Sequence, residues 1–278
     1  MLILQTVSEL KEWVRNTKKA GKTIGLVPTM GFLHEGHLSL VEKAKIENDK
    51  VVMTIFVNPA QFGPNEDFDR YPRDLERDQA LAEGAGTDVI FAPTVEEMYP
   101  RVSQIQLTAG AQADVLCGAK RPGHFDGVLK VVTKLFHLVQ ADLAYFGQKD
   151  AQQVAIFESL VADYNFPMAV RRVETVREDD GLAKSSRNIY LSDAERNEAP
   201  HLRRALEMGK ELFLQGQDPI EPMTAYITEH TSGTIDYIEL LDYPTLTSTI
   251  QQDAILALAV KFEKARLIDN IIFNSKGN

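Results

Sequence analysis

The chain has 278 residues, of which 44% are hydrophobic and 25% charged, and its formal net charge is −10. This composition is that of a globular protein long enough to bury a full core without disulfides or structural metals. The acidic balance argues against a nucleic-acid partner, because acidic surfaces repel phosphate backbones.

The location in the cell follows from two negative observations and one residue. Residues 1–7 are too short and too polar for a signal peptide. No apolar run approaches the ~20 residues that span a bilayer, so no membrane contact is expected. The single cysteine, Cys117, cannot form an intrachain disulfide and fits a reducing compartment. We therefore expect a cytoplasmic protein.

Short apolar runs and amphipathic stretches alternate through the N-terminal half of the chain. Runs that predict buried strands lie at residues 24–27, 51–57, 89–91, 143–146 and 169–173. Stretches with helical spacing lie at residues 38–45, 75–82, 128–139 and 154–161. This alternation predicts an α/β domain over residues 1–175, with a parallel sheet and helices on both of its faces. Ligands of such sheets bind at the carboxyl ends of the strands.

The character of the sequence changes at about Val176, after which helices precede strands. Asp193 is a suitable N-cap for a helix over residues 196–214, and residues 219–230 read as another helix. Strand-like runs follow at residues 235–241, 255–262 and 267–273. We expect a smaller α+β C-terminal domain over residues 176–278.

The sharpest chemical pattern is P-T-M-G-F-L-H-E-G-H, which lies between a predicted strand and a predicted helix and contains His34 and His37. A helix beginning near His37 would offer free N–H groups and a positive dipole end to a phosphate. Two histidines three residues apart can face the same phosphate and donate to charge that builds during displacement. The alternative is a structural pair, or a metal ligand. The flanking Gly31 and Gly36 favour a nucleotide site.

Two further segments are suited to phosphate, F-G-Q-K-D at 146–150 and K-S-S-R-N at 184–188. Lys149 could reach a β- or γ-phosphate as a mobile positive charge. The hydroxyls of Ser185 and Ser186, with the Arg187 guanidinium, match triphosphate oxygens, and their loop could close over ATP. Solvated charges at a strand end and a hydrophilic loop between domains are the alternatives.

Two remaining motifs are F-V-N-P-A-Q-F-G at 56–63 and R-P-G-H-F-D-G at 121–127. Gln61 presents an amide that can bind both a carboxylate and hydroxyls, although an ordinary Asn-Pro turn is the alternative. Gly123 and Gly127 favour a tight loop that faces a ligand. For His124 we favour a structural role.

Six motifs in this order resemble the pantothenate synthetase family, over roughly residues 23–192 with a similar tail. They are P-T-M-G-x-L-H-x-G-H, F-V-N-P-x-Q-F-G, Y-P-R, R-P-G-H-F-x-G-V, F-G-x-K-D-x-Q-Q and D-G-L-A-x-S-S-R-N. The resemblance implies a Rossmann-like ATP domain, a homodimer and an ATP-dependent ligation with Mg²⁺. Pantoate is first converted to pantoyl-adenylate with release of pyrophosphate. The amine of β-alanine then gives pantothenate and AMP.

The resemblance also implies roles for individual residues. His34 and His37 stabilise the α-phosphate, and Lys149 and Arg187 hold the phosphates. Gln61 and Gln153 hold pantoate, with Gln61 also near β-alanine. The residues implied to contact ATP are Met30, Gly31, His34, His37, Gly147, Gln148, Lys149, Asp150, Val176, Lys184, Ser185, Ser186 and Arg187. Asp78 is conceivable as a metal-shell residue, but the Mg²⁺ ligands remain unassigned.

Three other interpretations predict different behaviour. A nucleotidyltransferase that releases its nucleotide adduct would need no amine site. A nucleotide sensor would bind ATP without turnover. A fragment of a class I aminoacyl-tRNA synthetase fits poorly with the acidic charge and the lack of a tRNA-binding extension.

Overall fold

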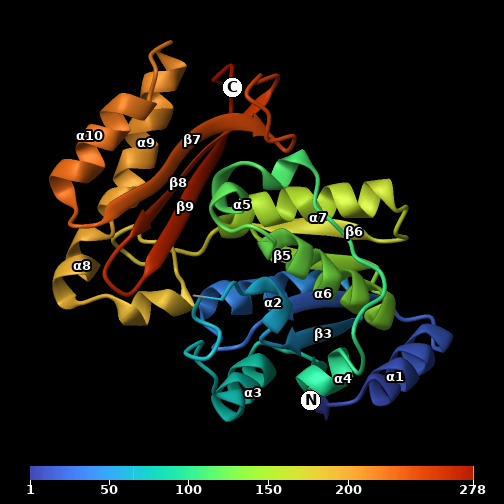
Figure 1. Cartoon of the computed structure of the whole chain (residues 1–278). Helices are drawn as coiled ribbons and strands as arrows, with labels where there is room; N and C mark the ends of the chain where they lie inside the picture. Colours follow the sequence, from blue (N-terminus) through green and yellow to red (C-terminus); the bar gives the residue numbers. More distant parts are fainter. Residues whose placement is uncertain (65, 278) are drawn as a thin grey trace. The chain divides into compact units, whose positions relative to one another are not determined.

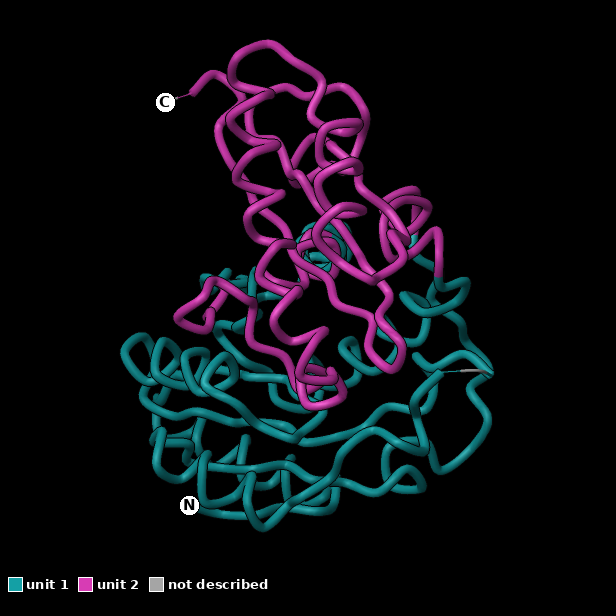
Figure 2. Tube along the Cα trace, turned by 90° about the vertical axis from the view of Figure 1, so that its left-hand side faces the viewer, with its two compact units in different colours: residues 1–109, 121–148, 156–174 teal, residues 110–120, 149–155, 175–278 magenta. Residues whose placement is uncertain are grey.

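The computed structural model describes residues 1–64 and 66–277 (Figure 1). It divides into two compact units, shown in different colours in Figure 2. Unit 1 comprises residues 1–109, 121–148 and 156–174, and unit 2 comprises residues 110–120, 149–155 and 175–278. The sequence predicts a single domain boundary after residue 175. In the structure, residues 110–120 and 149–155 precede that boundary but belong to unit 2.

Unit 1 contains a six-stranded parallel sheet. Its strands are β1 (Leu2–Leu4), β2 (Ile24–Thr29), β3 (Lys50–Ile55), β4 (Val89–Phe91), β5 (Leu143–Gly147) and β6 (Ala169–Val173). They lie in the order β1-β4-β3-β2-β5-β6, and every neighbouring pair is parallel. The chain moves from β2 toward β3 on one side, and β5 lies on the other side of β2. The sheet therefore has a topological switch point between β2 and β5.

Helices flank this sheet. They are α1 (Val7–Lys19), α2 (Glu35–Glu47), α3 (Leu75–Gly84), α4 (Val95–Met98), α6 (His124–Val139) and the later part of α7 (Ala151–Asp163). Val27, Met53 and Tyr145 share a buried cluster with Leu40 and Val41 of α2. Successive residues of a strand point to opposite faces, and residues 24–27 and 51–54 are buried without interruption. Both faces of the central strands are therefore covered, as the Rossmann-like class requires.

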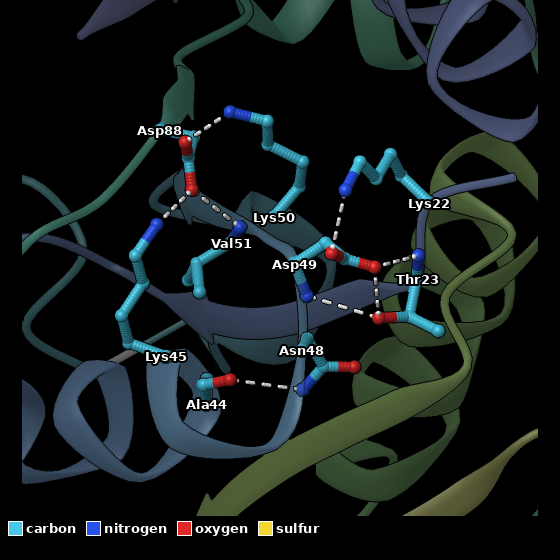
Figure 3. A network of polar contacts seen from close by, with 9 residues as sticks. All are labelled: Lys22, Thr23, Ala44, Lys45, Asn48, Asp49, Lys50, Val51 and Asp88. Atoms are coloured by element: carbon cyan, nitrogen blue, oxygen red, sulfur yellow. Dashed lines mark hydrogen bonds and ion pairs between the residues drawn. The ribbon is translucent and has the colours of Figure 1, made fainter. Parts of the chain in front are cut away.

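Aspartates tie together the amino ends of the strands. Asp49, Asp88 and Asp142 each stand one residue before, in turn, β3, β4 and β5. Their carboxylates accept the backbone N–H of Thr23 at 3.0 Å, of Val51 at 2.9 Å and of Ile24 at 2.7 Å, respectively. We call each of these aspartate contacts a clamp. Figure 3 shows the clamps of Asp49 and Asp88, together with the lysines that pair with each carboxylate. Side chains thus satisfy the amino ends of β2 and β3.

Unit 2 is built on an antiparallel sheet of β7 (Thr234–Tyr243), β8 (Asp253–Lys261) and β9 (Arg266–Asn274), in that order. Its helices are α5 (Leu116–Lys120), α8 (Asp193–Glu198), α9 (His201–Leu214) and α10 (Ile220–His230). Figure 1 shows α9 and α10 along this sheet, and Leu202, Leu206 and Met223 form a core with Leu256 and Leu258 of β8. The described residues also include four short 3-10 helices: η1 (Pro59–Gln61), η2 (Ala111–Ala113), η3 (Gln148–Asp150) and η4 (Ser186–Tyr190).

The predicted α/β class is confirmed, but three local expectations are wrong. The helix after β2 begins at Glu35 rather than near His37, because His34 is its N-cap. The helix predicted over 196–214 is two helices, α8 and α9, with Pro200 at the break and Ser192 rather than Asp193 as the N-cap of α8. Residues 124–127 form the first turn of α6 rather than a loop. Within the described ranges, none of the helices has the length and apolar character of a membrane span.

Candidate active site

The histidine motif follows the carboxyl end of β2, at the switch point of the sheet. Gly147 and Gln148 lie at the carboxyl end of β5, the neighbouring strand on the other side of that point. Gln61 stands in η1, six residues beyond the end of β3. Three of the predicted segments therefore lie at adjacent strand ends of one sheet, which is where open parallel sheets bind ligands.

His34 and His37 cap the first turn of α2 reciprocally. The Nδ1 atom of His34 accepts the N–H of Gly36 at 3.1 Å, and the Nδ1 atom of His37 accepts the N–H of His34 at 3.3 Å. The two ring centroids lie 4.1 Å apart. A ring nitrogen that accepts an N–H carries no proton, so this pattern assigns the proton of each neutral ring to Nε2. Each imidazole is thereby oriented as an Nε2–H donor.

Gly36 makes this arrangement possible. A Cβ atom at this position would lie 2.9 Å from Cε1 and 3.0 Å from Nδ1 of His34. Real Cβ contacts are essentially never this short, so a larger residue would push the His34 ring out of the cap. The glycine of H-E-G-H therefore has a steric reason beyond the ligand approach inferred from sequence.

Asp78 of α3 holds the loop that precedes His34. Its side chain is only 1% exposed and accepts the N–H of Phe32 and of Leu33, both at 2.7 Å. Burial raises the pKa of the Asp78 carboxyl, an effect that the two N–H donors oppose. Arg77 adds a hydrogen bond to the Leu33 carbonyl at 2.9 Å and lies over the Phe32 ring. Asp78 thus supports the backbone of the histidine motif.

Gln61 is oriented by its neighbours in unit 1. Its Oε1 accepts from Nδ2 of the buried Asn58 at 3.0 Å, and its Nε2 lies 3.2 Å from the sulfur of Met30. Asn58 also donates to the Gly127 carbonyl at 3.0 Å and accepts from the Tyr99 hydroxyl at 2.8 Å. The structure therefore brings Met30 and Gln61, predicted separately, into contact. Asn58 thus orients the Gln61 side chain, a contact that was not predicted from the sequence although both residues stand in the same motif.

The segment 121–127 supports the backbone of the same turn. The Nδ1 atom of His124 lies 2.8 Å from the Gln61 carbonyl, and Arg121 pairs with Glu66 and reaches the same carbonyl at 3.5 Å. A Cβ on Gly127 would lie 1.9 Å from the Ala60 carbonyl oxygen, so only glycine lets α6 pack against η1. These contacts agree with the structural role favoured for His124.

Residues 149–155, which directly follow Gln148, belong to unit 2. Lys149 and Asp150 lie in η3, with Lys149 half-buried and Asp150 exposed. Gln153 lies half-buried in the first turn of α7. The adjacent Gln152 is buried and donates to the carbonyls of Gln112 and Val115, both at 2.8 Å. Of this glutamine pair, Gln152 has the structural role.

The loop that carries Val176 to Arg187 is a tight antiparallel turn in unit 2. Lys184 donates its N–H to the Val176 carbonyl at 3.0 Å, and its Nζ pairs with Glu178 at 3.1 Å. Ser185 caps η4 by accepting the N–H of Arg187 at 3.2 Å, and Ser186 is buried. A small pocket is lined by Lys149, Ser185 and Asn188, among others. The structure therefore brings Lys149 and the serine loop together within unit 2.

Among the described residues, no group of three or more His, Cys, Asp or Glu side chains could hold a metal ion. Mg²⁺ with a nucleotide is usually held through phosphates and water with one or two carboxylates, so such a cluster is not needed for it. The carboxylate of Asp78 is instead engaged by backbone N–H groups.

The chain is similar over its length to known proteins. The sequence profile of the family "Pantoate-beta-alanine ligase" matches residues 2–272. A curated pantothenate synthetase of Lysinibacillus sphaericus (strain C3-41) is 59% identical over 281 residues, covering 99% of this chain and 99% of that protein.

Solved structures agree. The pantothenate synthetase of Thermus thermophilus superposes with a TM-score of 0.91 at 46% identity, covering 98% of this chain and 99% of the other. The pantoate-beta-alanine ligase of Francisella tularensis, complexed with Beta-gamma ATP and Beta-alanine, has a TM-score of 0.82 at 33% identity, covering 100% and 99%. From the fold, the ordered motifs and these matches together, the chain belongs to the pantoate-beta-alanine ligase family.

Proposed function

We propose that this chain joins pantoate to β-alanine in two steps, through a pantoyl-adenylate formed from ATP. In the first step the carboxylate of pantoate attacks the α-phosphorus of ATP and pyrophosphate leaves. In the second step the amine of β-alanine attacks the acyl carbon, AMP leaves and pantothenate is formed. Membership of the pantoate-beta-alanine ligase family supports this reaction, as does the Francisella tularensis relative, whose structure is complexed with Beta-gamma ATP and Beta-alanine.

The observation that carries the proposal is the reciprocal capping of His34 and His37 at the first turn of α2. Displacement at the α-phosphorus builds negative charge on its oxygens. Two Nε2–H donors beside the positive end of a helix are suited to stabilise that charge, and they need no reorganisation during the reaction. The histidines act in this proposal as hydrogen-bond donors and not as bases.

The remaining motif residues take binding roles. Gln61 and Gln153 bind the carboxylate and hydroxyls of pantoate, with Gln61 also near β-alanine. Lys149 and Arg187 supply positive charge to the triphosphate, and Val176 lies against the adenine. Further contacts to ATP come from Met30, Gly31, Gly147, Gln148, Asp150, Lys184, Ser185 and Ser186. Support for these roles is the match of each motif and the side-chain chemistry.

The chemistry explains why the motifs contain donors and cations rather than a nucleophile. A carboxylate acylates poorly because its oxygen is a poor leaving group, and adenylation replaces that oxygen with AMP. The reaction then needs aligned reactants and neutralised charge more than proton transfer. His, Lys, Arg, Ser and amide side chains provide both.

Three further parts of the proposal concern the metal, the assembly and the compartment. ATP is used with Mg²⁺, which neutralises phosphate charge, as general nucleotide chemistry favours. The enzyme is a homodimer, as the family resemblance implies. It acts in the cytoplasm, which the single cysteine Cys117 favours.

A product assay tests the reaction. The protein is mixed with ATP, Mg²⁺, pantoate and β-alanine, and nucleotides and pantothenate are separated. The proposal predicts AMP and pantothenate in equal amounts, both dependent on β-alanine. A nucleotidyltransferase would release an adduct without β-alanine, and a sensor would leave ATP intact. ADP as the nucleotide product would overturn the adenylate mechanism.

A further inference from the structure

Two adjacent residues of β9 contact both of the segments of unit 2 that are proposed to bind phosphate. Asp269 is joined through Arg177 to the loop that carries Lys184 to Arg187, and Asn270 is joined to Lys149. Neither Asp269 nor Asn270 belongs to a motif identified from the sequence. Asp269 and Asn270 are placed to hold these two segments rather than to contact the phosphates themselves.

The first link is a bidentate ion pair. The Nη1 and Nη2 atoms of Arg177 donate to the two carboxylate oxygens of Asp269, at 2.7 and 2.9 Å. The Asp269 side chain is 4% exposed and that of Arg177 is 20% exposed. Two parallel hydrogen bonds fix both the distance and the plane of a guanidinium. The pair therefore anchors the base of the loop to β9.

From Arg177 the anchor reaches the phosphate-binding residues through short backbone contacts. Arg177 pairs with Ala183 in an antiparallel bridge and donates to the Gly181 carbonyl at 3.0 Å. The Ala183 carbonyl in turn accepts from Nδ2 of Asn188 at 3.1 Å, which closes the segment containing Ser185 to Arg187. The turn from 176 to 188 is thus a small hydrogen-bonded unit with an ionic attachment to Asp269.

The second link holds Lys149. The Nδ2 atom of the buried Asn270 donates to the backbone carbonyl of Lys149 at 2.9 Å. The N–H of Asn270 donates to Oδ1 of Asp269 at 2.8 Å, so the two residues are also tied to each other. β9 is an edge strand of its sheet. Among the described residues, only β8 pairs with it.

We infer that Asp269 and Asn270 are positioning residues for ATP, which set the spacing between Lys149 and the loop of Ser185 to Arg187. The inference rests on the proposed role of those residues in phosphate binding. A reacting geometry is sensitive to shifts of about 1 Å, which can cost on the order of 100-fold in rate. Side chains locked by surrounding hydrogen bonds prevent such shifts. Asp269 and Asn270 supply those bonds from one rigid strand.

The test uses Asp269→Asn, which weakens the ion pair, and Asn270→Ala, which removes the bond to the Lys149 carbonyl. Asp236→Asn is the matched control. Asp236 lies in β7 of the same sheet, is 7% exposed and pairs with Arg266, whose side chain is 22% exposed. Its ion pairs join it to Arg266 and Lys261, neither of which is proposed to bind phosphate. Each variant is assayed for thermal unfolding, for adenylate formation at varied ATP and for Mg·ATP binding by calorimetry.

The inference predicts that Asp269→Asn and Asn270→Ala lower kcat/KM for ATP by roughly 10- to 100-fold. The KM for β-alanine should stay within about twofold, because the second step uses an adenylate that is already formed. Asp236→Asn should keep the wild-type KM for ATP even if its Tm falls. Unchanged ATP kinetics in Asn270→Ala, or an equal loss in Asp236→Asn, would overturn the inference.

Two arrangements keep the test decisive. If Asp269→Asn does not fold, Arg177→Lys takes its place, because it keeps the charge while losing the bidentate geometry, and it should give an intermediate loss in kcat/KM for ATP. If the wild-type protein binds Mg·ATP but forms no adenylate, the proposed function fails. Calorimetry of Mg·ATP binding then still tests whether Asp269 and Asn270 position the ATP-binding residues. Weaker ATP binding in Asn270→Ala would then support the inference, and equal binding would contradict it.

Discussion

The Nδ1 atoms of His34 and His37 both accept backbone N–H groups at the start of α2, while their ring centroids lie 4.1 Å apart. The same two side chains therefore cap the helix through one nitrogen and are left with Nε2–H as the donating group. The capping role and the proposed catalytic role use different atoms of each ring, so substitutions can separate the two roles.

His34→Asn and His34→Ala should differ in stability but not in activity. Asn places an oxygen near the position of Nδ1 and is a favoured N-cap, whereas Ala loses the cap at a cost of about 0.5–2 kcal/mol. Both remove the Nε2–H donor and should slow adenylate formation by roughly 10²–10³. Chemical denaturation and single-turnover adenylation measure the two effects. Near-normal adenylation in both variants would exclude His34 from the transition state.

Asp78→Asn should lower both stability and adenylation. An amide oxygen can replace only one of the two acceptors used by Phe32 and Leu33, and a buried unsatisfied donor costs about 1–3 kcal/mol. The freed loop should misplace His34. Glu76→Gln, in the first turn of the same helix, is the control and should leave both properties unchanged. A destabilised Asp78→Asn with wild-type adenylation would show that the loop does not position the histidines.

Lys149→Ala and Arg187→Ala should affect ATP more than folding. Each removes a positive charge proposed to neutralise phosphate oxygens, so KM for ATP should rise or the adenylation rate should fall by roughly tenfold or more. Lys22→Ala serves as the control. Lys22 precedes β2, and its side chain pairs with Asp49. Unchanged ATP binding and turnover in both variants would refute the triphosphate assignment.

Stability should fall in acid because of the clamp at Asp49. The N–H of Thr23, followed by the Lys22 side chain, lowers the pKa of Asp49 from 3.8 to about 2. A carboxyl whose pKa is lower in the folded state stabilises the fold above its unfolded pKa and loses this as pH falls through the folded value. Wild-type unfolding free energy should therefore exceed that of Asp49→Asn above about pH 4, and the gap should shrink toward pH 2. A gap independent of pH would contradict the clamp.

Much of the fold could be predicted because its central strands are covered on both faces and appear as unbroken apolar runs. All five predicted N-terminal strands and all three C-terminal ones are confirmed. The three-residue β1 is a largely exposed edge strand with no such signal. Helix α1 was missed although Thr6 and Glu9 form a capping box. The apolar periodicity that spans α8 and α9 predicts one helix, whereas Pro200 separates the two helices in the structure.

In the candidate site, too, some residues could be predicted from the sequence and others could not. The histidine, lysine and serine-arginine motifs are local patterns, so their proposed chemistry can be inferred from residues that are neighbours in the sequence. Their supports are not local: Asp78 lies 46 residues from Phe32, and Asp269 lies 92 residues from Arg177. No periodicity links such pairs, because they meet only through the packing of separate elements. Sequence therefore indicated the donors, and the structure was needed to find the residues that hold them.

Isotope exchange shows most directly whether an adenylate forms before the amine takes part. The enzyme is incubated with ATP, Mg²⁺, pantoate and labelled pyrophosphate in the absence of β-alanine. If the adenylate is an intermediate, label should enter ATP, and omitting pantoate should abolish this exchange. Gln61→Ala and Gln153→Ala should depress the exchange strongly, because each removes an amide proposed to bind the carboxylate and hydroxyls of pantoate. An enzyme that makes pantothenate but shows no such exchange would rule out the adenylate as an intermediate.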